Sequence, residues 1–241
     1  MKRLLLFLSA YALALTIGLQ AEPAVEVIQP NIRIELQVVA IPEEIAIPLV
    51  AEMKQKDKIE AANARIQELL AKGVAKLVGW PTVTTRSGQR AVSEAINELR
   101  YATEYSPPTV GVFPNVPADT TVKIAPTVDV TTFEGLPTAF ETRDTGVTLA
   151  VEPVLSPDGK TISLDLEPQH VRLQGFNKVT IEGAARKGKV IVEQPQFETH
   201  KVTTSLILRN GERVLMGIFP TSEPPKHLEF FILKAEASPV E

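Results

Sequence analysis

Three histidines, His170, His200 and His227, are the side chains of this sequence best suited to metal binding or proton transfer. They are separated by 30 and 27 residues, and each abuts a segment with the pattern of a β-strand. They could converge in the folded chain, but these separations do not match the short spacings of metal-binding motifs. We therefore interpret them as histidines at the rim or on the surface of a sheet, and we expect no metal site.

A second candidate is the acidic pair Asp165 and Glu167, two residues apart on one face of a predicted strand, as paired catalytic carboxylates would be. A solvated polar face explains the pair equally well. The sequence contains no G-x-S-x-G, Walker, G-x-G-x-x-G or H-E-x-x-H motif, and no cysteine. We predict no catalytic residue, no cofactor and no enzymatic activity.

The composition excludes several further classes of protein. Of the 241 residues, 44% are hydrophobic and 22% are charged, which is typical of a folded chain rather than a disordered one. The absence of cysteine excludes disulfide frameworks and Cys-based metal sites. The formal net charge of -4 provides no basic field, so we predict no nucleic-acid partner.

Residues 1–21 have the pattern of a secretory signal peptide. Lys2 and Arg3 precede an apolar run over residues 4–19, and Ala21 offers a small residue at a cleavage site. The alternative is an uncleaved N-terminal anchor, although the run is shorter than the roughly 20 residues that a membrane span needs. Either way, we expect an exported protein of the periplasm or outer membrane of a Gram-negative-type bacterium.

A strand and two helical segments are expected after the signal. Alternating apolar residues over 31–40 predict a strand with one buried face. Prolines limit residues 43–52 to a short or kinked helix at best. A longer helix is predicted over 58–72, with Asp57 as its N-cap, Glu60 as the capping-box partner and Gly73 as its end.

The next segments favour strands, with one ambiguity. Residues 75–85 are apolar and β-branched, and Ser87-Gly88 marks a turn. Residues 91–101 have helical periodicity, yet they follow this turn where a hairpin partner for residues 83–85 would lie. Residues 104–136 are rich in proline and read as a long excursion or an irregular hairpin.

The second half of the chain predicts a run of antiparallel hairpins. Residues 145–166 alternate on both sides of the turn at 156–159, and residues 172–194 form a second excursion with a basic tip. Asn210-Gly211 predicts a hairpin between residues 201–209 and 212–219, and 228–233 form a final strand. The fold class is therefore α+β and β-dominated, with a short strand-helix part followed by antiparallel hairpins.

Three blocks of this sequence, in order, resemble the secretin homology domain of type II and type III secretion channels, and the likeness extends from about residue 31 to residue 234. In the first block, over 76–91, the residues that match the family pattern are Pro81, Gly88 and Ala91. In the second, over 145–164, they are Gly146, Val147, Leu149, Pro153, Asp158 and Gly159. In the third, over 195–217, they are Pro195, Thr199, Asn210, Gly211 and Gly217.

The resemblance implies a fold, a division of the chain and a function. Residues 91–101 should be a strand. The division is a signal peptide over 1–21, a strand-helix segment over 22–75, a secretin-like β domain over 76–235 and a tail over 236–241. The implied function is a channel-type component of protein secretion that self-associates into a ring, contacts other secretion or envelope proteins and reaches the membrane through its hairpins. The alternative is a soluble periplasmic binding or scaffold module that keeps the fold without a pore.

Overall fold

The computed structural model describes residues 30–105, 137–182, 189–222 and 225–238. The predicted signal peptide, most of the proline-rich excursion and the basic tip lie outside these residues. In the described part of the chain, no helix is long and apolar enough to cross a membrane.

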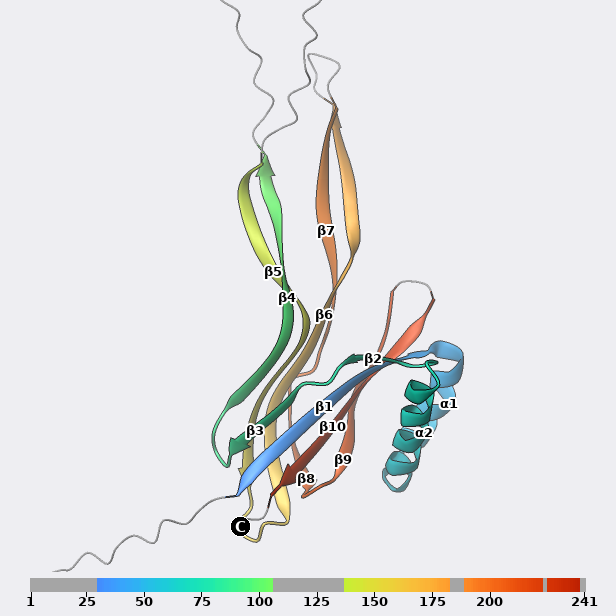
Figure 1. The fold of residues 1–241 in the computed structure, drawn as a ribbon, viewed down its shortest axis with the longest axis vertical. Coiled ribbons are helices and arrows are strands. Elements are labelled where there is room, and N and C mark those ends of the chain that lie inside the picture. Colours follow the sequence, from blue (N-terminus) through green and yellow to red (C-terminus); the bar gives the residue numbers. More distant parts are fainter. Residues whose placement is uncertain (1–29, 106–136, 183–188, 223–224, 239–241) are drawn as a thin grey trace, which may run out of the picture.

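Ten strands in the described residues form two five-stranded antiparallel sheets that share one core (Figure 1). Sheet A has the order β2-β1-β10-β9, with β3 also paired to β1. Its strands are β1 (Asn31–Pro42), β2 (Lys76–Gly79), β3 (Thr82–Arg86), β9 (Arg213–Pro220) and β10 (His227–Ala237). Sheet B has the order β4-β5-β6-β7, with β8 also paired to β6. Its strands are β4 (Ala91–Tyr105), β5 (Pro137–Leu155), β6 (Thr161–Glu182), β7 (Lys189–Lys201) and β8 (Thr204–Arg209). The α+β, β-dominated class is confirmed.

The predicted strand over 31–40 is confirmed as β1, and both of its faces contribute to a core. Ile32, Ile34 and Leu36 are fully buried in the cluster between the two sheets. Val39 and Ile41 are buried on the opposite face, in a second cluster with the helices. Because side chains alternate along a strand, β1 lies at the centre of a three-layer structure of helices, sheet A and sheet B.

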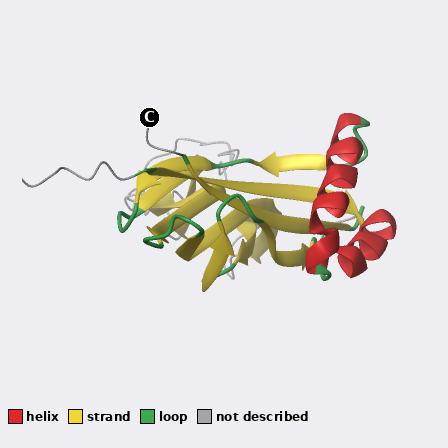
Figure 2. Cartoon of the chain, turned by 90° about the horizontal axis from the view of Figure 1, so that it is seen from below, coloured by secondary structure: helices red, strands yellow, loops and turns green. Residues whose placement is uncertain are grey.

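The helical layer consists of α1 (Glu43–Met53), the short 3-10 helix η1 (Lys56–Lys58) and α2 (Ile59–Ala71), with both α-helices at one side of the strands (Figure 2). The predicted cap of α2 is wrong, because Asp57 lies within η1 and Lys58 occupies the N-cap without a side-chain cap bond to any described residue. Glu60 instead forms an ion pair with Arg213 of β9. Gly73 follows α2 with a φ of 69°, which agrees with its predicted role as the end of the helix.

The ambiguous segment after the first turn is strand β4, as the family resemblance implied. Its expected partner is wrong, however. β4 pairs with β5 from Ala91↔Val151 to Tyr105↔Pro137, whereas β3 pairs with β1 through Ile34↔Val83. The turn at Gly88 thus carries the chain from sheet A to sheet B instead of closing a hairpin.

The turn at Asn210-Gly211 also connects the two sheets, so the predicted hairpin is wrong here as well. Gly211 has a φ of 81°, and the N–H of Glu212 donates to the Arg209 carbonyl at 2.9 Å, so the turn itself forms. The preceding strand β8 pairs with β6, however, and the following strand β9 pairs with β10. Apolar residues on both strands, among them Leu208 of β8 and Val214 of β9, belong to the core between the sheets or pack against it.

The two remaining predicted hairpins are confirmed as the pairs β5–β6 and β6–β7. β5 and β6 pair from Leu155↔Ile162 to Gly146↔Val171. Beyond this point β5 continues with β4, and β6 continues with β7 to Glu182↔Lys189. The two pairs therefore leave the sandwich as separate long ribbons (Figure 1).

Candidate functional site

A cluster of ionisable side chains occupies the end of the core from which the two ribbons depart. Along β6, every second residue from Ile162 faces sheet A, and this row ends in His170 and Arg172. Along β10, Phe231 and Leu233 face sheet B, and Glu229 continues their row. The alternation that builds the apolar core thus also directs these charged groups inward.

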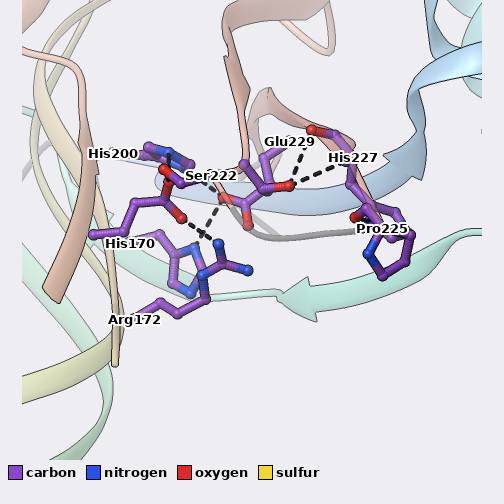
Figure 3. Close-up of polar contacts among 9 residues, drawn as sticks. His170, Arg172, His200, Ser222, Pro225, His227 and Glu229 are labelled. Carbon is purple, nitrogen blue, oxygen red and sulfur yellow. Dashed lines mark hydrogen bonds and ion pairs between the residues drawn. The ribbon is translucent and has the colours of Figure 1, made fainter. Parts of the chain in front are cut away.

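Two histidines share one oxygen of Glu229 (Figure 3). The Nδ1 atoms of His170 and His200 lie 3.0 Å and 2.7 Å from Oε2 of Glu229. The exposed fractions of the three residues are 7%, 8% and 2%, so the cluster is almost shielded from water. His170 and His200 are direct partners across β6 and β7, and Glu229 comes from the facing sheet. The contacts therefore join the base of the β6–β7 ribbon to sheet A.

Aromatic rings hold one of the histidines in place. The ring of His200 stacks on Phe219 with 5.0 Å between centroids and 11° between planes. Phe219 in turn contacts Phe231 edge-on at 5.1 Å. This chain of contacts fixes the orientation of the His200 ring against the apolar core.

A second carboxylate, Glu198, lies behind His200. It forms an ion pair with Arg172, and it accepts hydrogen bonds from the backbone N–H of Ser222 at 2.9 Å and from the Ser222 hydroxyl. Its Oε1 lies 3.8 Å from Nε2 of His200. Nε of Arg172 is buried without a hydrogen-bond partner in the described part of the chain.

These contacts decide the ionisation of both carboxyl groups. Burial by itself would raise the pKa of Glu229, but hydrogen bonds from His170 and His200 and their positive charge lower it to about 2. Burial also opposes ionisation of Glu198, yet the Ser222 donors and the Arg172 guanidinium lower its pKa. Both carboxylates are therefore charged at neutral pH.

The interpretation of the histidines as rim or surface residues is wrong for two of the three. His170 and His200 are buried and converge on Glu229, whereas His227 is half-buried outside the cluster, with its Nδ1 2.6 Å from the Pro225 carbonyl. The sequence did contain a signal for the buried position, because His170 continues the inward alternation of Leu164 and Leu166. Glu229 was overlooked, although it lies in the same alternation as the fully buried Phe231.

The acidic pair on β6 lies on the other face of sheet B, toward solvent. Asp165 is exposed and accepts a hydrogen bond from Ser205, and Glu167 forms an ion pair with Lys201 at 2.5 Å. Neither contacts the buried cluster, which agrees with the reading of a solvated strand face.

Several of the residues that match the family pattern lie at turns or in the core of the structure. Val147 and Leu149 are buried between the sheets, and the Gly88 N–H donates to the Pro153 carbonyl at 2.7 Å, which joins the first two blocks. Four motif glycines have positive φ angles, namely Gly88, Gly146, Gly159 and Gly211. Oδ1 of Asp158 accepts hydrogen bonds from the Ser156 hydroxyl and from the Lys160 N–H within the β5–β6 turn.

Comparison with known proteins gives one family match. The model of the family called Secretin, described as bacterial type II and III secretion system protein, matches residues 69–219. None of the curated proteins matches the chain significantly.

Three secretins are among the solved structures that are similar to this chain. The InvG secretin domain β-barrel from the Salmonella SPI-1 injectisome is 11% identical, with a TM-score of 0.44 over 90% of this chain and 66% of that one. GspD, the type II secretin from enteropathogenic Escherichia coli, is 11% identical, with a TM-score of 0.43 over 90% and 71%. PilQ, the type IV competence pilus secretin from V. cholerae, is 10% identical, with a TM-score of 0.43 over 89% and 62%. The chain thus spans about two thirds of the length of these structures.

Proposed function

Because the chain belongs to the secretin family of bacterial type II and III secretion system proteins, we propose that its copies assemble into an envelope ring whose wall consists of strands β4 to β7. The observation that carries this proposal is the pair of long ribbons that leaves the sandwich at Gly146 and Val171. Strands that extend past the core do not contribute to the packing of the sandwich itself. In a ring, neighbouring copies would cover them.

The strand order supports closure by edge-to-edge pairing. β4 and β7 are the outer strands of the order β4-β5-β6-β7, and successive strands are antiparallel. After four alternating strands, β7 of one copy and β4 of the next run in opposite directions, so the antiparallel pattern continues from copy to copy. Such pairing would satisfy the backbone groups that an open edge leaves exposed.

Exposed apolar side chains on the ribbons also support contact with a neighbouring copy or with the membrane. Phe140, Phe176 and Ile191 lie on the ribbons, and 48%, 47% and 58% of their surface is exposed. Large apolar side chains on both ribbons are better accommodated against a neighbouring copy or the membrane than in water.

Cysteine cross-linking tests the pairing, because the natural sequence has no cysteine. We expect Glu98→Cys on β4, combined with Gln194→Cys or Gln196→Cys on β7, to give a ladder of oxidised multimers of the full chain in the cell envelope. The matched control is Glu44→Cys combined with Glu68→Cys on the exposed faces of the two helices. Monomers from every β4–β7 pair, or an equal ladder from the control, would contradict the proposed wall.

Cell fractionation separates this proposal from a scaffold that keeps the fold without a pore. The proposed exported protein loses residues 1–21 and is recovered with the outer membrane, where it contacts copies of itself and other secretion components. Release of the full-length mature chain with the periplasm, as a monomer by sedimentation, would favour the scaffold. The limits 22–75, 76–235 and 236–241 remain the proposed division of the mature chain.

A further inference from the structure

We propose that His170, His200 and Glu229 form a binding site for a divalent transition-metal ion, with zinc as the ion of choice. The site does not depend on ring assembly, because all three residues belong to one chain. The match to the secretin family does not assign a metal site to these residues.

The geometry of the three ligand atoms suits a zinc ion. One nitrogen of each histidine and one carboxylate oxygen of Glu229 all lie within 4.8 Å of one another, and the Nδ1 atoms of His170 and His200 lie 3.0 Å and 2.7 Å from Oε2 of Glu229. In a tetrahedral zinc site with bonds of about 2.0–2.1 Å, neighbouring ligand atoms are about 3.3 Å apart. Small outward movements of the two rings would therefore open the space that the ion needs.

The type of ligand selects the metal. Two imidazole nitrogens with one carboxylate oxygen suit zinc and its neighbours in the transition series, whereas calcium and magnesium prefer sites made of oxygen alone. Three protein ligands leave a fourth position to water or to the second oxygen of Glu229.

The surroundings already resemble the outer shell of a metal site. A histidine that binds metal through one nitrogen usually directs the other toward a carboxylate or a carbonyl. Nε2 of His200 faces Glu198 at 3.8 Å, and Ser222 and Arg172 hold Glu198 in place. The Phe219 ring fixes the plane of the imidazole. The outer shell is thus in place before any ion arrives.

The consequence of binding would be mechanical. The ligands come from β6, β7 and β10, so one ion would cross-link the base of the β6–β7 ribbon to sheet A. Occupancy of the site would then set how firmly the ribbon is held relative to the sandwich.

The test is a zinc titration of the full chain, purified without a histidine tag and stripped with EDTA. We expect one zinc ion per chain by calorimetry, and a melting temperature higher by about 5–10 °C at a hundredfold excess over Kd. The Co²⁺-loaded protein should show the intense visible absorption of four-coordinate cobalt. Neither measurement requires a variant, so absence of stoichiometric zinc and of the cobalt spectrum would overturn the proposal.

Variants locate the ion. His170→Gln and His200→Gln should each weaken zinc binding more than a hundredfold, and Glu198→Gln should weaken it about tenfold through the outer shell. The matched control is His227→Gln, the remaining histidine, which should bind zinc as the wild type does. Unchanged affinity in folded His170→Gln and His200→Gln proteins, or loss of binding in His227→Gln, would refute the site.

Discussion

Gly146 lies where β5 separates from β6, and replacing it by alanine should destabilise the protein strongly. Its φ is 123°, a region that residues with a side chain rarely adopt. A Cβ atom at this position would lie 2.1 Å from the Ala95 carbonyl oxygen on β4. Ordinary contact begins at 3.4 Å, so β4 would have to move by about 1.3 Å, the difference of these two distances.

The expected cost of Gly146→Ala combines two contributions. A residue forced into this backbone region costs about 1–3 kcal/mol. Displacement of β4 weakens one or two ladder hydrogen bonds, at about 1 kcal/mol each. We therefore expect the free energy of unfolding to fall by about 3–4 kcal/mol, measured by urea denaturation of the full chain at one fixed concentration.

Gly159→Ala is the matched control. Gly159 also has a positive φ, 69°, but an added Cβ would have nothing within 4 Å. Only the cost of the left-handed conformation remains, about 1–2 kcal/mol. If Gly146→Ala were no more destabilising than Gly159→Ala, the close approach of β4 to Gly146 would not exist in solution, and the reasoning would fail.

Three other changes probe the core, the cluster and the turn between the sheets by urea denaturation. The pKa of Glu229 is lowered from 4.5 to about 2, so the ionised carboxylate stabilises the fold above pH 4.5, and this stabilisation is lost as the pH falls through 2. Between about pH 5 and pH 2, in EDTA, the free energy of unfolding of the wild type should therefore fall by about 3 kcal/mol more than that of Glu229→Gln. Parallel pH profiles would contradict this linkage. Phe231→Ala should cost about 3–5 kcal/mol because the ring is fully buried, whereas Ile207→Ala, at a side chain 72% exposed, should change stability by less than about 0.5 kcal/mol; equal effects would contradict the assigned core. Asn210→Ala should cost about 1–2 kcal/mol, because this side chain donates to the Gly159 carbonyl and accepts from the Ala237 N–H; an unchanged urea midpoint would contradict that role.

Local patterns were sufficient for most elements of the fold. The alternation over 31–40 and over 162–166 predicted the strands and the faces that pack between the two sheets, because side-chain direction in a strand depends only on position along the chain. The prediction that β1 has one buried face is wrong for its second half, because Val39 and Ile41 on the opposite face are buried beneath the helices. The turns at Gly88, Gly159 and Gly211 were also predicted correctly, since a positive φ is a local requirement that glycine meets. The order of three blocks was enough to indicate the secretin family.

Pairing between distant strands was not determined locally. The turns at Gly88 and Gly211 have the residues of hairpin turns, yet both lead from one sheet to the other. A turn fixes the direction of the chain over a few residues, whereas the choice of partner depends on how much apolar surface the whole sandwich buries. Likewise, the helical periodicity of residues 91–101 gave way to the ladder with β5.

The sequence by itself determined that the chain is β-rich, that its strands have defined inner faces and that it resembles a secretin. Only the tertiary structure decided that His170, His200 and Glu229 meet, because three residues separated by 30 and 29 positions become neighbours only when two sheets face each other. Because the three side chains are buried, their contact affects their ionisation and the stability of the fold. Away from water, charged groups must be satisfied by one another, by protons or by a metal ion.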